Sequence, residues 1–314
     1  MRDKPYTIAE LMEFQRKNRK IKKQTIYPML LQIDEELVKE EVPVMKHPIE
    51  AIERLQKRLN TIITSNDPLF KIITGFFGNL YPLKDQTIPP MHRGVFYFQG
   101  VIYEMYMGMV FGKFNIDIYR FIKGISKIKM QQLRTSYEHR VYIDQCCDLM
   151  DFGLGMMRFD REENFENETV DLVLSGKSQL NSMTESLLSE TGQDAAMSNA
   201  LLGSEMLLKG CLVQKGLPMK EAKKLSHSLI KIVEKLSEMI PEVDINGLKK
   251  AINNIPSNVS DRYRNKNYTI KQLGYCAMSA QFIAGEAMRI LTSQNQRDGF
   301  KIDGEDSIIQ RVFP

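Results

Sequence analysis

DAAMSNALLGSEMLLKGCLVQKG, residues 194–216, is the clearest indicator of the architecture, because it predicts a long helix that ends at Gly216 with Pro218 just beyond. Three further helical stretches are expected around it, at Val170–Glu190, Lys220–Ile240 and Thr269–Ser293. We find no convincing β-alternation, no dinucleotide-binding glycine motif and no phosphate-binding P-loop motif. The sequence therefore predicts an all-α protein.

The N-terminal half is also expected to be helical. Thr7-x-x-Glu10 predicts a capping box, and Pro48 suits the first turn of a second helix. Residues 91–150 read as two or three long helices, and the apolar run Val95–Phe111 predicts a helix central in the core. The polar, acidic stretch after Gly153 predicts a boundary. The predicted organisation is a helical N-terminal domain at 1–152, an acidic linker at 153–169, a bundle at 170–296 and a tail at 297–314.

Composition limits the class of protein. The chain has 314 residues, of which 43% are hydrophobic and 26% charged, so it can bury one or two cores. No apolar run is long enough for a membrane span and no secretory leader is visible, so a cytoplasmic protein without membrane contact is expected. The net charge of +4 permits an acidic partner. The four cysteines form no C-x-x-C pair, which favours buried free thiols over a zinc site or disulfides, and we predict no metal or cofactor.

Three short segments of the second half stand in a recognisable order. They are Ser204-Glu205-Met206-Leu207-Leu208-Lys209-Gly210, Leu225-Ser226-His227-Ser228-Leu229 and Asp261-Arg262-Tyr263-Arg264. In this order the segments resemble the HEPN family, the higher-eukaryote and prokaryote nucleotide-binding domains, over about residues 175–293. Ser228 departs from the pattern, since many relatives carry an acidic residue there.

The resemblance implies an up-and-down helical bundle after a helical N-terminal domain. It also implies a homodimer that binds RNA or a nucleotide, in a bacterial or phage setting such as defence or toxin–antitoxin systems. The residues it points to are Glu205, Lys209, His227, Arg262, Tyr263 and Arg264. The residues themselves leave alternatives open. Glu205 and Lys209 can form a plain i, i+4 pair, and His227 can be a packing residue at a helix start. Arg262 and Arg264 can clamp phosphate beside a stacking Tyr263, or Arg262 can lock onto Glu205.

Many relatives in this family are ribonucleases with an Arg-x4–6-His motif, and Arg134-Thr135-Ser136-Tyr137-Glu138-His139 is a match. A metal-independent endoribonuclease that uses Arg134 and His139 is therefore one alternative function. The two side chains face the same way only if the helix bends or widens between them. A second alternative is a structural module that binds another protein through Val95–Phe111. Asp144, Asp148 and Asp151, on nearby helix faces, are expected to form a solvated acidic ridge.

Overall fold

The computed structural model describes residues 8–64, 67–81, 91–108, 116–159, 164–189, 193–256, 268–299 and 311–313. The contacts divide the chain into two compact units, Met1–Ile88 and Pro89–Pro314. The described residues are predominantly helical, with one two-stranded sheet, so the predicted all-α class is confirmed. No helix in these ranges is long and apolar enough to cross a membrane.

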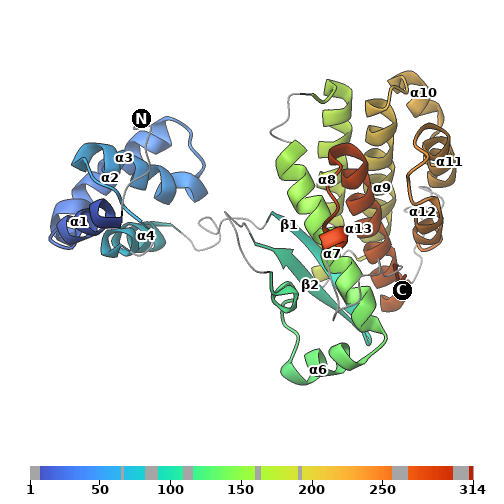
Figure 1. The fold of residues 1–314 in the computed structure, drawn as a ribbon, viewed down its shortest axis with the longest axis horizontal. Coiled ribbons are helices and arrows are strands. Elements are labelled where there is room, and N and C mark those ends of the chain that lie inside the picture. Colours follow the sequence, from blue (N-terminus) through green and yellow to red (C-terminus); the bar gives the residue numbers. More distant parts are fainter. Residues whose placement is uncertain are drawn as a thin grey trace. The chain divides into compact units, whose positions relative to one another are not determined.

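The described residues of the first unit form four α-helices: α1 (Ile8–Asn18), α2 (Lys23–Lys39), α3 (His47–Leu59) and α4 (Pro68–Leu80) (Figure 1). Pro48 lies in the first turn of α3, as predicted. Thr7 of the expected capping box lies outside the described residues. Buried His47 anchors the unit, since its Nδ1 lies 2.7 Å from Asp34 and its Nε2 lies 2.8 Å from the carbonyl oxygen of Val42.

The second unit is built on four long helices, α7 (Glu138–Phe159), α8 (Asn167–Leu188), α9 (Gln193–Gln214) and α13 (Ile270–Thr292). Shorter helices α10 (Met219–Lys224), α11 (Leu229–Met239) and α12 (Ile245–Ile252) cover α9 and α13, and α6 (Lys127–Thr135) precedes α7 (Figure 1). Gly176 lets α8 approach α9 closely, because a Cβ there would lie 2.7 Å from the Leu207 side chain. The predicted helical bundle is therefore present.

Residues 92–107 correct the prediction of a central helix. They form a hairpin of two antiparallel strands, β1 (His92–Phe98) and β2 (Val101–Met107), joined by Gln99 and Gly100. Both turn residues have positive φ, 46° and 83°, as a two-residue type I′ turn requires. The flanking runs are rich in aromatic and β-branched residues, which favour strands. The long helix on which the protein-interaction alternative rested is therefore absent from the described residues.

Both long edges of the hairpin carry hydrogen bonds to other segments. On β1, the Gln281 amide receives the N–H of Val95 at 2.6 Å and donates to its carbonyl oxygen at 2.9 Å. On β2, the N–H of Lys123 donates to the carbonyl oxygen of Glu104, and Tyr106 donates to that of Phe121. The hairpin is thus tied to α13 on one side and to the segment before α6 on the other.

The division of the chain differs from the predicted one. Helix α7 runs through Gly153 without a break to Phe159, whereas the predicted linker begins at residue 153. The reason is packing: α7 lies along α13, and its apolar side chains such as Phe152 and Met156 belong to the same core as α8 and α9. Residues 89–152 are therefore part of the second unit. The four cysteines are buried and free, as expected.

Candidate functional site

Glu205, Lys209 and His227 are brought together beside the C-terminal half of α9. Glu205 Oε1 accepts a hydrogen bond from Lys209 Nζ at 2.7 Å, and Glu205 Oε2 lies 2.7 Å from His227 Nδ1. Lys209 also donates to the carbonyl oxygen of Ser226 at 2.8 Å, in a turn where Ser226 has φ 53°. Glu205 and Lys209 are 6% and 7% exposed. Their charges therefore hold the turn after α10 against α9.

This arrangement separates the roles of the predicted binding residues. Glu205 and Lys209 satisfy each other inside the protein, whereas the His227 side chain is 54% exposed and can meet a ligand. The buried Glu205 carboxylate beside Nδ1 orients the His227 imidazole. Catalytic and metal-binding histidines are often oriented in the same way, by a hydrogen bond to the ring nitrogen that does not meet the ligand. Arg262, Tyr263 and Arg264, the third predicted segment, lie outside the described residues.

Arg134 and His139 meet on either side of a third residue, Tyr119. The guanidinium carbon of Arg134 lies 3.8 Å from the centroid of the Tyr119 ring, and the Tyr119 hydroxyl lies 2.9 Å from His139 Nε2. The helix does not continue between the pair. Helix α6 ends at Thr135, Ser136 is extended with ψ 165°, and α7 starts at Glu138. This break brings the two side chains to one place, which a continuous helix would not do.

The Arg134–Tyr119–His139 cluster has the electrostatics of a neutral base beside a cation. Partial burial, with a contribution from the Arg134 guanidinium, lowers the pKa of His139 below its ordinary 6.5. The imidazole is therefore neutral at physiological pH, and it can accept a proton. Arg134 is exposed, and so is the nearby Tyr137, of which 67% of the residue surface is exposed. Tyr119 is the member that sequence reasoning missed, because it lies outside the motif.

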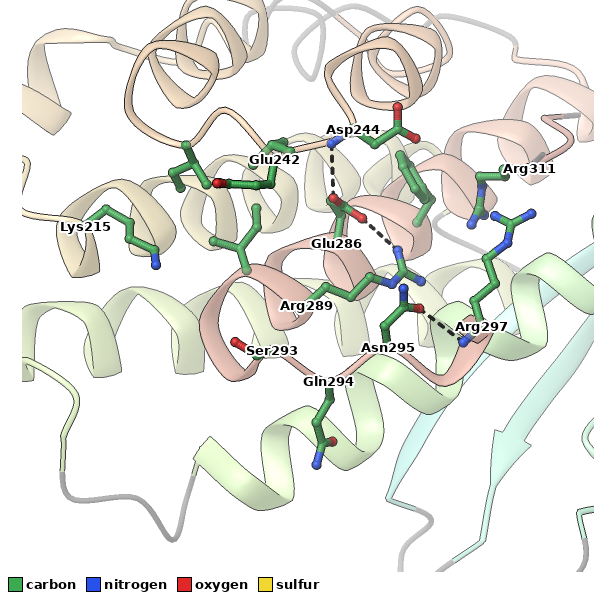
Figure 2. A pocket seen from close by; sticks show the side chains of 14 residues that line it. Lys215, Glu242, Asp244, Glu286, Arg289, Ser293, Gln294, Asn295, Arg297 and Arg311 are labelled. Carbon is green, nitrogen blue, oxygen red and sulfur yellow. Dashed lines mark hydrogen bonds and ion pairs between the residues drawn. The ribbon is translucent and has the colours of Figure 1, made fainter. Parts of the chain in front are cut away.

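A pocket of about 510 Å³ lies between the end of α13, the segment before α12 and the C-terminal residues of the chain (Figure 2). Its charged lining includes Glu286, Arg289, Arg297 and Arg311. Most of these side chains bond to protein partners. Arg289, for example, donates to Glu286 at 2.9 Å and to Asp148 at 2.6 Å.

The three aspartates of α7 form the buried side of this network, which corrects the expected solvated ridge. Asp148 and Asp151 have no exposed surface and Asp144 is 6% exposed. Asp148 accepts hydrogen bonds from Arg289 and Arg311, Asp151 from Arg289 at 2.7 Å, and Asp144 lies 2.8 Å from Arg297. These pairs fasten α7 to α13 and to the chain end. Within the described ranges, no group of three or more His, Cys, Asp or Glu side chains could hold a metal ion.

The network predicts a pH dependence of stability that arises from Asp151. Burial raises the pKa of this carboxyl from 3.8 to about 6, against the opposing effect of Arg289. The folded state therefore holds a proton that the unfolded state releases, so the stabilisation is complete below pH 3.8 and is lost as the pH rises through 6. Asp151→Asn does not titrate. Its free energy of unfolding relative to wild type should rise by about 2 kcal/mol from pH 4 to pH 7 in urea titrations. Parallel pH profiles for the two proteins would contradict this assignment.

Comparisons with known proteins returned no match. No family model fits the chain, and no curated protein or solved structure is significantly similar to it.

Proposed function

We propose that the chain is a HEPN-like RNA-binding protein and that the Arg134–Tyr119–His139 cluster is the centre of its RNA contact. The observation that carries the proposal is the exposed Arg134 guanidinium, whose carbon lies 3.8 Å from the centroid of the Tyr119 ring. Tyr137, three residues further along the chain, is also exposed. A guanidinium clamps phosphate oxygens with two parallel hydrogen bonds, and a tyrosine ring stacks on a nucleobase. Arg134 thus offers a contact for the RNA backbone, and the neighbouring Tyr137 offers one for a base.

The segment around the cluster favours a polyanion. Between residues 116 and 140 there are six cationic side chains and two carboxylates. The cations are Arg120, Lys123, Lys127, Lys129, Arg134 and Arg140. One of the two carboxylates, Asp117, pairs with Arg120 on the surface. Neutralising phosphates with such a segment releases counterions, which supplies most of the affinity of sequence-independent binding.

The other residues that the HEPN resemblance points to enter the proposal in supporting roles. Glu205 and Lys209 position the turn that carries His227, and His227 is a further contact for RNA or a nucleotide. Arg262, Tyr263 and Arg264 stay in the proposal as a second contact, on the strength of the resemblance alone. A homodimer, in a bacterial or phage defence or toxin–antitoxin system, belongs to the same proposal.

The experiment is a gel shift with labelled single-stranded RNA in EDTA. Arg134→Ala should weaken binding about tenfold and lower the slope of log K against log salt by about 0.7, because one phosphate contact is lost. Lys231→Ala, which removes one exposed charge from α11, is the matched control and should leave both quantities unchanged. Wild type that does not shift the RNA, or Arg134→Ala that binds like wild type, would remove the proposed contact.

A second candidate function, a metal-independent endoribonuclease, is favoured by the shared contact of Arg134 and His139 with Tyr119. In this reaction neutral His139 takes the proton of a ribose 2′-hydroxyl, and the 2′-oxygen attacks the adjacent phosphorus. The bond to the 5′-oxygen breaks, and a proton from a second imidazole completes the 5′-hydroxyl product and leaves a 2′,3′-cyclic phosphate. Arg134 stabilises the charge that develops on the phosphorane. In a two-fold dimer the second imidazole is the partner's copy of His139, which donates from its protonated form, the minor form at physiological pH. The same gel reports cleavage.

A further inference from the structure

A second pocket, distinct from the RNA site, lies between the hairpin and α8. It has a volume of about 370 Å³ and is lined by Met91, His92, Arg93, Lys177, Asn181, Thr184 and Glu185. The lining residues of α8 recur at steps of four, three and one, so they occupy one face of the helix. Strand β1 supplies the opposite wall with His92 and Arg93.

Two buried side chains of this pocket carry polar atoms that the protein leaves without a partner. His92 is 4% exposed and its Nδ1 makes no hydrogen bond, and Thr184 is 1% exposed and its Oγ1 makes none. Buried polar atoms are nearly always paired in folded proteins, and an exception calls for an explanation. Two exceptions on facing walls of one pocket are explained together if a ligand supplies the missing partners.

The charges around the pocket show which kind of ligand fits. Arg93 is neutralised by ion pairs with Glu104 and Glu185. Lys177 has no ion pair or hydrogen bond with any residue that the structure describes, so its charge is uncompensated. Burial, with a contribution from Lys177, lowers the pKa of His92 to about 3, so the imidazole is neutral and offers a hydrogen bond rather than a charge. One free cation and several neutral polar groups match an anion.

We propose that this pocket binds the phosphate group of a small phosphate monoester. Lys177 supplies the charge, while the Asn181 amide, the Thr184 hydroxyl and the His92 imidazole supply hydrogen bonds to the oxygens. A phosphate monoester presents three terminal oxygens in a tetrahedral arrangement and up to two negative charges, so it fits groups that converge from two walls better than a planar carboxylate with a single charge does. A volume of about 370 Å³ exceeds the need of a bare phosphate ion and leaves space for the organic part of an ester. The proposal does not depend on RNA binding.

Isothermal titration of the full chain in a phosphate-free buffer tests the proposal, with glycerol 3-phosphate, inorganic phosphate and acetate as probes. Glycerol 3-phosphate should bind more tightly than inorganic phosphate, and acetate should bind least. Lys177→Met removes the charge but keeps the stem, and Thr184→Val removes a hydroxyl that no protein group uses, so neither should unfold the chain. Each variant should weaken the binding of glycerol 3-phosphate by about tenfold.

Lys231→Met on α11 is the matched control and should bind like wild type. The proposal would be overturned by no binding of either phosphate, by acetate binding as tightly as phosphate, or by unchanged affinity in both Lys177→Met and Thr184→Val. A melting curve for each variant separates loss of the pocket from loss of the fold. Inorganic phosphate that binds as tightly as the ester would assign the pocket to the free ion and overturn the ester assignment.

Discussion

Replacing His139 with alanine should lower the rate of RNA cleavage by about two orders of magnitude or more, which is the usual contribution of a positioned general base. The expectation follows from three features: the His139 imidazole is neutral, the Arg134 guanidinium lies near it, and the Tyr119 hydroxyl lies 2.9 Å from His139 Nε2. The measurement is a single-turnover time course with end-labelled single-stranded RNA in EDTA. RNA binding should change little in this variant, because the Arg134 guanidinium remains.

Two controls make the His139 experiment specific. Tyr119→Phe keeps the ring that supports Arg134 but removes the hydrogen bond to the imidazole, so it should reduce the cleavage rate less than His139→Ala does. The acidic limb of the wild-type rate profile should lie below pH 6.5, because the pKa of His139 is lowered. Cleavage that persists in folded His139→Ala would exclude the mechanism that uses Arg134 and His139.

Replacing Arg289 with leucine should lower the free energy of unfolding by about 3–5 kcal/mol, the usual cost of removing one partner from a buried ion network. Arg289 bonds to Asp148, Asp151 and Glu286, and the two aspartates have no exposed surface. Without the guanidinium, two buried carboxylates on α7 lose a counter-ion at once. Urea unfolding at pH 7 is the measurement, and the loss should shrink at pH 4, where Asp151, whose pKa burial raises to about 6, is protonated.

Arg297→Leu is the matched control for Arg289→Leu. The Arg297 side chain is 20% exposed and pairs with Asp144, which is less buried than Asp148 and Asp151, so its removal should cost about 1 kcal/mol. If Arg289→Leu loses no more stability than Arg297→Leu, the three-carboxylate contact does not contribute as the geometry implies.

The helices of the bundle could be predicted from the local periodicity of apolar residues, whereas the hairpin could not be predicted from periodicity. Thr269 caps α13 with the reciprocal hydrogen bonds to Gln272 that such a residue favours, and the predicted helix Thr269–Ser293 is confirmed as Ile270–Thr292. In β1, however, neighbouring residues Val95 and Phe96 are both fully buried, so period-two alternation is lost. The available signal was the two-residue Gln99-Gly100 turn between aromatic and β-branched runs.

The candidate sites show the same division between local and distant information. The spacing of Asp144, Asp148 and Asp151 shows that they share a face of α7, but their partners Arg289, Arg297 and Arg311 lie more than 130 residues away. Nothing local predicts that such a face is buried. Likewise, the Arg134/His139 spacing is visible in the sequence, whereas the helix break at Ser136 and the contact with Tyr119 depend on tertiary packing.

The hydrogen bonds along the two sides of the hairpin restrict how copies of the chain can associate. An unpaired strand edge invites a strand of another molecule to extend the sheet, which is a common route to dimers and to aggregates. Here the outward N–H and C=O of Val95 are hydrogen-bonded to the Gln281 amide. On the other edge, the C=O of Glu104 and the N–H of Tyr106 are hydrogen-bonded to the backbone of residues 121–123. The proposed homodimer should therefore form through helix faces, with the sheets of the two copies remaining separate.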